Sequence, residues 1–492
     1  MKYLFSLLTL ITLHASAQKY TFIESESKVK DFMHETFTTS SGKYVDLQYW
    51  FPLGPLKYRD GRNAIVDVYD HQLKQLLSKH LEATEGKRFE AGYTVGDELI
   101  LFFSDKANIV YGYKLNVEDG TASLVGELLK PTDKDAGLRI RLSPDESHFC
   151  LVYRTIGKNE PSTYTGVVTD QQLKVINKFS ASDDEPDKNV EYVQYAVSDN
   201  GVFNIITAVN GSDSKKDYNP LNYSIKQINA EGTTSSAPLT GIPAGLFSRV
   251  TWNAVKNDVQ FHGLLKKEKK AGFTAVIGGI YDGLQKKVTA LKQTDLGLEI
   301  SGDAVSRGTY TLKDNSTVIM LEEGERNNGT SMLVPRTVGS GMTMQHTTTN
   351  IQSFNLYVIK ISSNNELTWI KTIYKEQMEI NYRTYTGSAI LRDNNDGFHI
   401  FFQDCRKNTD LKETEPHRVV APGNGKKDAL AAVYINQDGK MTKKFLAQDE
   451  DSDVLFSTIG TVTEGGNRLI YRSYQHKNLG RSFYHLAAIT IK

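Results

Sequence analysis

The chain has 492 residues, of which 39% are hydrophobic and 24% charged, and its 58 basic and 58 acidic side chains cancel at neutral pH. A neutral chain has no electrostatic field that would gather nucleic acid, which excludes that class of partner. The composition is that of a globular protein, but the length exceeds the roughly 250 to 300 residues that one hydrophobic core supports. The sequence therefore predicts either several domains or one domain built from repeats.

The first seventeen residues have the pattern of a secretory signal peptide. Lys2 supplies a positive charge, residues 3–13 are largely apolar, and residues 15–17 are the small residues that precede a signal-peptidase cut. Because the apolar run is too short to cross a bilayer core of about 30 Å, we expect it to be removed. The mature chain would begin at Gln18 and act as a monomer in a periplasm, on a cell surface or in the medium, without a membrane span.

The chain has two cysteines, Cys150 and Cys405, which are too few for disulfides to be the main stabilising element of a protein of this length. Each lies in an apolar strand pattern, where a small buried thiol is the expected role. An oxidising compartment would still permit one disulfide between them, so that alternative stays open.

One pattern recurs along the chain: a strand, a tight turn of Asp, Asn or Gly, and a second strand with an apolar run. It occurs seven times, at residues 93–103, 138–153, 192–209, 250–265, 310–321, 388–402 and 456–471. All but the last are followed by a second hairpin, at residues 111–128, 163–179, 223–239, 274–291, 354–373 and 431–446. Two hairpins per repeat predict a four-stranded antiparallel meander.

A four-stranded sheet has two faces to cover, and few helical patterns are present to cover them. Radial stacking of similar sheets would cover both faces of each sheet. The sequence therefore predicts an all-β fold of the β-propeller class. The seventh repeat has only the strand at 483–491 after its first hairpin, while unused strand patterns lie upstream at 43–51 and 64–69. We expect one of these to complete the last sheet and close the ring. This gives seven blades, or eight if residues 43–80 form a full blade.

The expected domain organisation follows from this count. A signal peptide occupies residues 1–17, and an N-terminal extension at 18–60 is a candidate source of the ring-closing strand. A single propeller domain occupies residues 61–492, because the chain has only 12 prolines and no low-complexity tract that would mark a flexible linker.

Residues 142–149, Leu-Ser-Pro-Asp-Glu-Ser-His-Phe, precede an apolar strand at 150–153. Proline presets the backbone for a turn there, and Asp145 can bond the backbone beyond it. This segment resembles the repeat of TolB-like β-propellers, in which Ser-Pro-Asp-Gly precedes an apolar strand, although Glu146 stands where that family usually has glycine. Residues 197–201 are similar. The resemblance implies the propeller fold and no particular activity.

Motifs of catalysis and metal binding are missing from the sequence. It has no Gly-x-Ser-x-Gly elbow and no closely spaced histidine pair, so we predict no metal site and no cofactor. The acidic run at 393–397 superficially resembles a calcium loop, but a hairpin turn is the favoured interpretation. The runs at 183–187 and 449–453 are better calcium candidates, although solvated acidic loops between blades are the favoured interpretation of both.

The longest connections separate the two hairpins of a repeat, and in a propeller such connections share one face. Two are outsized insertions in neighbouring repeats, at residues 322–352 and 404–428. Loops beyond about 12 to 15 residues in a compact fold are usually functional or disordered. The connections within repeats carry an excess of Lys and Arg, whereas those between repeats include the acidic runs, so charge alone selects no ligand.

These observations favour a non-catalytic binding protein whose two insertions contact a protein or glycan partner. Arg and His side chains suit carboxylate or hydroxyl recognition, and the candidates within or next to the insertions are Arg326, Arg336, His346, Arg406, His417 and Arg418. The alternative is a glycan-active enzyme with a pair of carboxylates at the mouth of the propeller. The sequence does not choose among its many carboxylates.

Overall fold

The computed structural model describes residues 20–25, 33–49, 64–133, 136–157, 159–210, 221–229, 232–240, 246–255, 257–266, 271–328, 332–333, 345–346, 349–380, 386–421, 427–446, 454–475 and 483–492. These residues form strands, tight turns and a few single-turn helices. None of the helices in this part of the chain is long and apolar enough to cross a membrane. The expected signal peptide lies outside the described residues.

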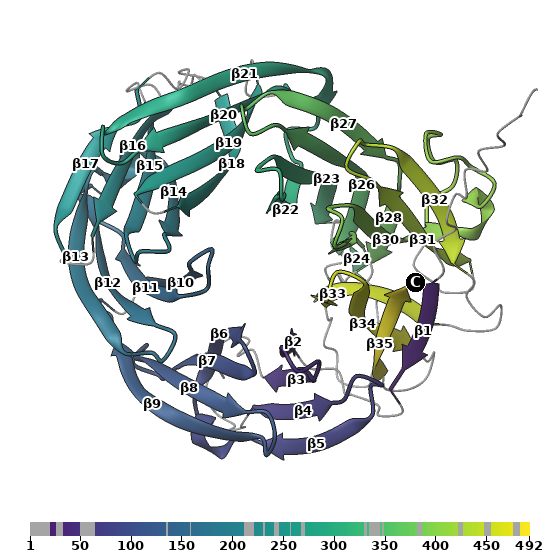
Figure 1. Ribbon diagram of the computed structural model, residues 1–492, viewed down its shortest axis with the longest axis horizontal. Coiled ribbons are helices and arrows are strands. Elements are labelled where there is room, and N and C mark those ends of the chain that lie inside the picture. Colours follow the sequence, from purple (N-terminus) through teal and green to yellow (C-terminus); the bar gives the residue numbers. More distant parts are fainter. Residues whose placement is uncertain are drawn as a thin grey trace, which may run out of the picture.

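Eight antiparallel sheets stand around a common axis as a β-propeller (Figure 1). The alternative of eight blades is therefore correct, and the favoured count of seven was wrong. In the first four blades the chain runs from the inside of the ring outward. Their strands are β2 (Met33–Thr38), β3 (Tyr44–Tyr49), β4 (Ile65–Tyr69) and β5 (Gln75–His80) in blade 1; β6 (Arg88–Val95), β7 (Glu98–Ser104), β8 (Val110–Asn116) and β9 (Thr121–Leu129) in blade 2; β10 (Gly137–Leu142), β11 (His148–Thr155), β12 (Pro161–Asp170) and β13 (Val175–Pro186) in blade 3; and β14 (Val190–Val197), β15 (Phe203–Asn210), β16 (Leu221–Ile228) and β17 (Thr234–Pro238) in blade 4.

The next three blades repeat this order, and blade 6 carries extra strands. They comprise β18 (Leu246–Val255), β19 (Asp258–Lys266), β20 (Phe273–Asp282) and β21 (Lys287–Ile300) in blade 5; β22 (Val305–Thr311), β23 (Thr317–Asn328), β26 (Thr349–Ile361) and β27 (Leu367–Ile373) in blade 6, with β28 (Gln377–Ile380) beside β26 and the small hairpin β24 (Met332–Leu333) and β25 (Gln345–His346); and β29 (Ala389–Arg392), β30 (Phe398–Cys405), β31 (Asp428–Ile435) and β32 (Met441–Leu446) in blade 7.

Blade 8 is made from both ends of the chain. Its inner strands are β33 (Val454–Glu464), β34 (Arg468–Gln475) and β35 (Phe483–Ile491), and its outer strand is β1 (Tyr20–Glu24), which pairs with β35. An N-terminal strand does close the ring, but the strands expected at 43–51 and 64–69 are instead central strands of blade 1. The propeller therefore begins at Tyr20, and the boundary expected at residue 61 falls inside blade 1.

Apolar runs form the middle strands because those strands are buried on both sides. In β7, Leu101 and Phe103 pack with residues of blade 1, whereas Ile100 and Phe102 pack with Phe149 of blade 3. Side chains alternate between the two faces of a strand, so a strand between two neighbours has no polar face. Cys150 and Cys405 are both buried and free. The buried-thiol interpretation is therefore confirmed, and the two cysteines form no disulfide.

The turn that carries the TolB-like resemblance joins β10 to β11. Glu146 N–H donates to the Ser143 carbonyl at 2.9 Å, and Asp145 accepts from the Ser147 backbone at 3.0 Å. Glu146 has a φ of 61°, in the left-handed region that favours glycine. The corresponding turn of blade 4 has Gly201, with a φ of 75°, and the same bond to Ser198. The geometry of the motif is thus present even where its glycine is replaced.

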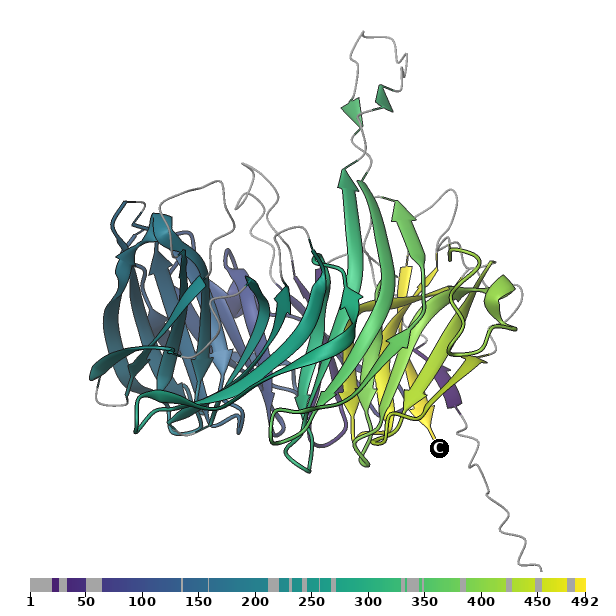
Figure 2. The same ribbon diagram turned by 90° about the horizontal axis from the view of Figure 1, so that it is seen from above.

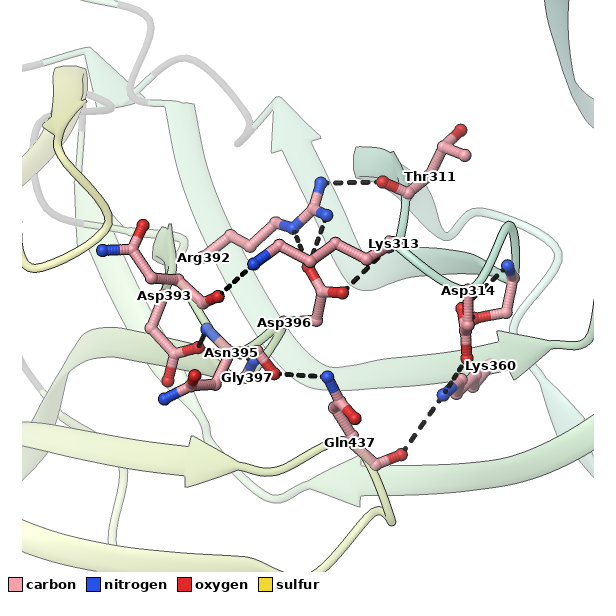
Figure 3. A network of polar contacts seen from close by, with 12 residues as sticks. Thr311, Lys313, Asp314, Lys360, Arg392, Asp393, Asn395, Asp396, Gly397 and Gln437 are labelled. Carbon is pink, nitrogen blue, oxygen red and sulfur yellow. Dashed lines mark hydrogen bonds and ion pairs between the residues drawn. The ribbon is translucent and has the colours of Figure 1, made fainter.

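The acidic run at 393–397 is the turn between β29 and β30, as the favoured interpretation required. Asp393 accepts from the backbone of Asn395 and Gly397 at 2.7 and 2.8 Å, and Asp396 accepts from the Lys313 backbone of blade 6 at 2.9 Å (Figure 3). Asn394 then donates to the Gly465 carbonyl of blade 8 at 3.0 Å. These carboxylates and amides link neighbouring blades through their turns.

Candidate binding face

The meander topology separates the connections of the propeller onto two faces. Tight turns join the first to the second strand of each blade and the third to the fourth strand of blades 1 to 7, and they define the turn face. Connections between the second and third strands, and between blades, define the long-loop face. Figure 2 shows the hairpin of blade 6 standing well above this second face. Both outsized insertions emerge there, as the sequence predicted.

The blade 6 hairpin is a continuous extension of two blade strands. Pairing between β23 and β26 continues past Glu322 and reaches Asn328 opposite Thr349, after a bulge near Gly324. On the other side of β26, strand β28 pairs with residues Asn350–Ser353. A third strand therefore supports the lower part of the hairpin, so this part of the insertion is built as sheet and not as loop.

A buried ionic cluster lies at the base of the hairpin. Glu322, at the end of the apolar run of β23, is fully buried, and its carboxylate lies 2.5 Å from Lys375 Nζ. Arg307 Nε donates to the same carboxylate. Burial alone would raise the pKa of Glu322, but the charges of Lys375 and Arg307 hold it below its usual value. The carboxylate is thus held ionised inside the protein.

Lys375 connects this base to its surroundings. Its Nζ donates to Ser353 Oγ at 2.5 Å and to Gln377 Oε1 at 2.8 Å, which fixes β26 and β28. Gln377 Nε2 in turn donates to the Gln403 carbonyl of blade 7 at 3.0 Å. The cluster therefore joins the hairpin of one blade to the strand that leads into the insertion of the next.

The blade 7 insertion is anchored in a similar way. Asp404 is fully buried and lies 3.0 Å from His417 Nδ1 and 2.9 Å from Lys443 Nζ. Burial raises the pKa of Asp404, but the His417 hydrogen bond and the Lys443 charge bring it below its usual value. Asn408 donates to the Val419 carbonyl at 2.7 Å. The described part of the insertion is therefore held on the blade by buried polar contacts.

The structure separates the six candidate contact residues. Arg326 lies in β23 opposite Ile351, His346 lies in β25 opposite Met332, and Arg336 falls outside the described residues.

The other three candidates lie together in the blade 7 insertion. Arg406, in the single-turn helix η4 (Arg406–Asn408), donates from Nε to the Asp428 carbonyl at 2.9 Å. The His417 side chain is 3% exposed, so it anchors the insertion and does not reach the surface. Arg418 is exposed and lies 3.3 Å from Glu415. Arg418 is thus the candidate here that is shown to be available to a partner.

The acidic run at 183–187 is not a solvated loop. Its first four residues end β13, and Asp187 begins the single-turn helix η3 (Asp187–Asn189). Asp183 accepts from Tyr164 at 2.7 Å, Asp184 pairs with Lys226 at 2.9 Å, and Asp187 pairs with Arg154. Asp184, and Asp183 through a further bond from Thr207, link blade 3 to blade 4, whereas Asp187 pairs within blade 3. The second run, at 449–453, lies outside the described residues.

One pair of carboxylates resembles what the glycan-active alternative requires. Asp46 and Asp67 are cross-strand partners in blade 1, and burial raises the pKa of Asp67. Burial alone would also raise the pKa of Asp46, but the charges of Arg472 and His34 have the larger effect and hold this pKa far below its usual value. The two residues are only 2% and 4% exposed, and Asp67 also accepts from Gln75 at 3.0 Å. This pair stabilises the junction of blades 8 and 1 and does not reach a substrate.

No family model and no curated protein matches the sequence. Among solved structures, the WD40 domain of SCAP from fission yeast is 9% identical, with a TM-score of 0.43 over 97% of this chain and 96% of that one. The polysaccharide lyase Uly1 is also 9% identical, with a TM-score of 0.38 over 95% and 100% of the two chains. Prolyl oligopeptidase B from Galerina marginata is 11% identical, with a TM-score of 0.38 over 81% and 50%.

The shared feature is the β-propeller fold. The comparisons assign no family, and the TolB-like resemblance stays limited to its turns. Likenesses as weak as these select no function for this chain.

Proposed function

We propose that this protein is an exported, monomeric, non-catalytic β-propeller that binds a protein or glycan partner through its long-loop face. The observation that carries the proposal is that both insertions rest on buried charges, Glu322 with Lys375 and Asp404 with Lys443. Burying charges is costly unless they are paired, so these anchors serve to hold projecting elements in place. Neither a metal nor a cofactor is needed for this role.

The proposal predicts that the hairpin can be shortened without loss of the fold but with loss of binding. Replacing residues 322–352 entirely would remove Glu322 and disturb the core. A better variant joins Asn327 to Asn350, which are register partners, through an Asn-Gly turn. It keeps the buried cluster and the pairing of β28.

The measurement is affinity capture from an extract of the source cells, followed by titration of the purified partner. We expect the shortened variant to bind the partner about tenfold or more weakly, because hairpin contacts are lost. Leu284→Ser is the control, since Leu284 is 81% exposed in a tight turn of blade 5 on the opposite face. Equal affinity of shortened and native proteins, or the absence of any captured partner, would reject the proposal.

A further inference from the structure

Two arginines lie on β10, which is the strand of blade 3 on the inner side of the ring (Figure 1). Leu138 and Ile140 of this strand, β10, pack toward blade 2. Arg139 and Arg141 alternate with them and therefore project to the side of blade 4. Arg139 is exposed and Arg141 is half-buried. Arg139 lies nearer the end of β10 that follows the long-loop face, whereas Arg141 lies two residues further on, close to the turn that begins at Ser143.

Among the side chains that the structure describes, none supplies a carboxylate partner to either arginine. Arg139 Nη1 donates to the Leu138 carbonyl at 2.9 Å, and Arg141 Nη1 donates to the Ile140 carbonyl at 3.0 Å. Three other arginines on innermost strands are neutralised, since Arg88 pairs with Glu90, Arg307 with Glu322 and Arg392 with Asp396. Within the described residues, the positive charges of β10 thus stand out as uncompensated.

Two described acids near these strands, Asp183 and Asp187, already have partners of their own. Asp183 accepts from Tyr164 at 2.7 Å and from Thr207 at 3.3 Å, and Asp187 accepts from Ser162 at 2.6 Å besides its pair with Arg154.

Arg154, on the neighbouring strand β11, brings a third guanidinium group, whose charge is paired with Asp187 and whose buried Nε has no hydrogen-bond partner. Burial raises the pKa of Tyr195 on β14 to about 12, against the opposing charges of Arg154, Arg139 and Arg141. All three guanidinium groups therefore act on one place between the inner strands of blades 3 and 4.

We propose that Arg139 and Arg141 form a binding site for a ligand that carries carboxylate or phosphate groups. Guanidinium groups bind such oxyanions in a bidentate manner. In both Arg139 and Arg141, one N–H group donates to a backbone carbonyl, which leaves other N–H groups for a ligand. Residues two apart on a strand are about 6.6 Å apart, so the site suits a ligand with two anionic groups or one group shared by both arginines.

This inference goes beyond the proposed function, because it gives the chemical class of a ligand bound at the innermost strand of blade 3. The test is calorimetric titration with citrate and, separately, inorganic phosphate at low salt, which distinguishes a carboxylate from a phosphate ligand. We expect native protein to bind at least one probe, and the double variant Arg139→Gln/Arg141→Gln to bind it about tenfold or more weakly. Added salt is expected to weaken binding.

The matched control removes the same charge elsewhere. Lys178→Gln/Lys287→Gln changes two exposed lysines on the outer strands β13 and β21 and is expected to bind like the native protein. Binding of neither probe below about 10 mM, or equal binding by both double variants, would overturn the site. Since these probes are small and need no hairpin, this result is independent of whether the hairpin partner exists.

A measurement on the unmodified protein covers the case in which the arginine variant does not fold. Phenylglyoxal labels accessible arginines, and mass spectrometry reads each position. Citrate or phosphate is expected to slow labelling of Arg139 and Arg141 while leaving the exposed Arg418 unchanged. Equal labelling rates with and without both probes would contradict the proposal.

Discussion

Replacing Lys375 by methionine is expected to lower the free energy of unfolding by about 3 to 5 kcal/mol. The substitution removes the ammonium group that lies 2.5 Å from the Glu322 carboxylate, and both side chains are almost completely buried. Arg307 alone would then face the charge of Glu322 from a side chain that is 26% exposed. Chemical denaturation followed by circular dichroism measures the change. A loss below about 1 kcal/mol would contradict a structural role for the pair.

The pH dependence gives a second readout of the same variant. In the native protein the pKa of Glu322 lies below its usual value, so its contribution to stability is present at neutral pH and is lost as the pH falls through the folded pKa. Without Lys375, burial raises that pKa, and Glu322 takes up a proton more readily. The difference between variant and native protein is therefore expected to narrow as the pH is lowered from 7 toward 4.

Two comparisons separate the buried pair from a general effect of losing a lysine. The double variant Glu322→Gln/Lys375→Met is expected to be more stable than Lys375→Met, because no unpaired carboxylate remains. Lys292→Met removes a lysine that pairs with Glu366 on the surface, where the two side chains are 45% and 56% exposed. Its expected change is within about 0.5 kcal/mol.

Removing the N-terminal strand is expected to have the second large effect. A chain that begins at residue 26 lacks the five register pairs between β1 and β35 and the edge-to-face contact of Tyr20 with Phe401. At roughly 1 kcal/mol for each hydrogen bond lost, the expected destabilisation is about 3 to 5 kcal/mol. The uncovered edge of β35 is also expected to promote self-association, which light scattering measures.

A synthetic peptide of residues 18–25 tests whether this effect comes from ring closure. Added in excess, it is expected to restore much of the lost thermal stability by occupying the vacant edge, whereas a scrambled peptide is not. A truncated protein as stable as the native one would contradict closure by β1. A truncated protein that no peptide rescues would show that other contacts of the N-terminal segment matter more.

The sequence predicted most of the ring because its turns carry a local signal. Asp, Asn and Gly at the turns and apolar runs in the middle strands located both hairpins of blades 2 to 7. It gave the first blade only as an alternative, at residues 43–80, and missed its strand β2, Met-His-Glu-Thr-Phe-Thr, because this strand has polar side chains that pair inside the protein. His34 contacts Asp46 at 2.9 Å, and Thr36 donates to Asp46 at 3.1 Å. Such a strand has no apolar pattern.

The candidate site was predicted at the level of segments and not of residues. Loop length located both insertions, but it gave no means of separating the exposed Arg418 from the buried His417. The anchors had a weak local signal, since Glu322 and Asp404 each follow an apolar strand run. Their partners, Lys375 and Lys443, lie in other strands or connections, and that pairing depends on tertiary structure. Arg139 and Arg141 likewise gain significance only once nearby acids are seen to be occupied.

The most direct test of the central claim is hydrogen exchange of the protein with and without its captured partner. Binding through the long-loop face predicts slower exchange in residues 406–421 and in the hairpin segments 324–328 and 349–353, with no change at the turns around Gly96 and Gly201 on the other face. Protection confined to those turns, with unchanged exchange in both insertions, would contradict the claim.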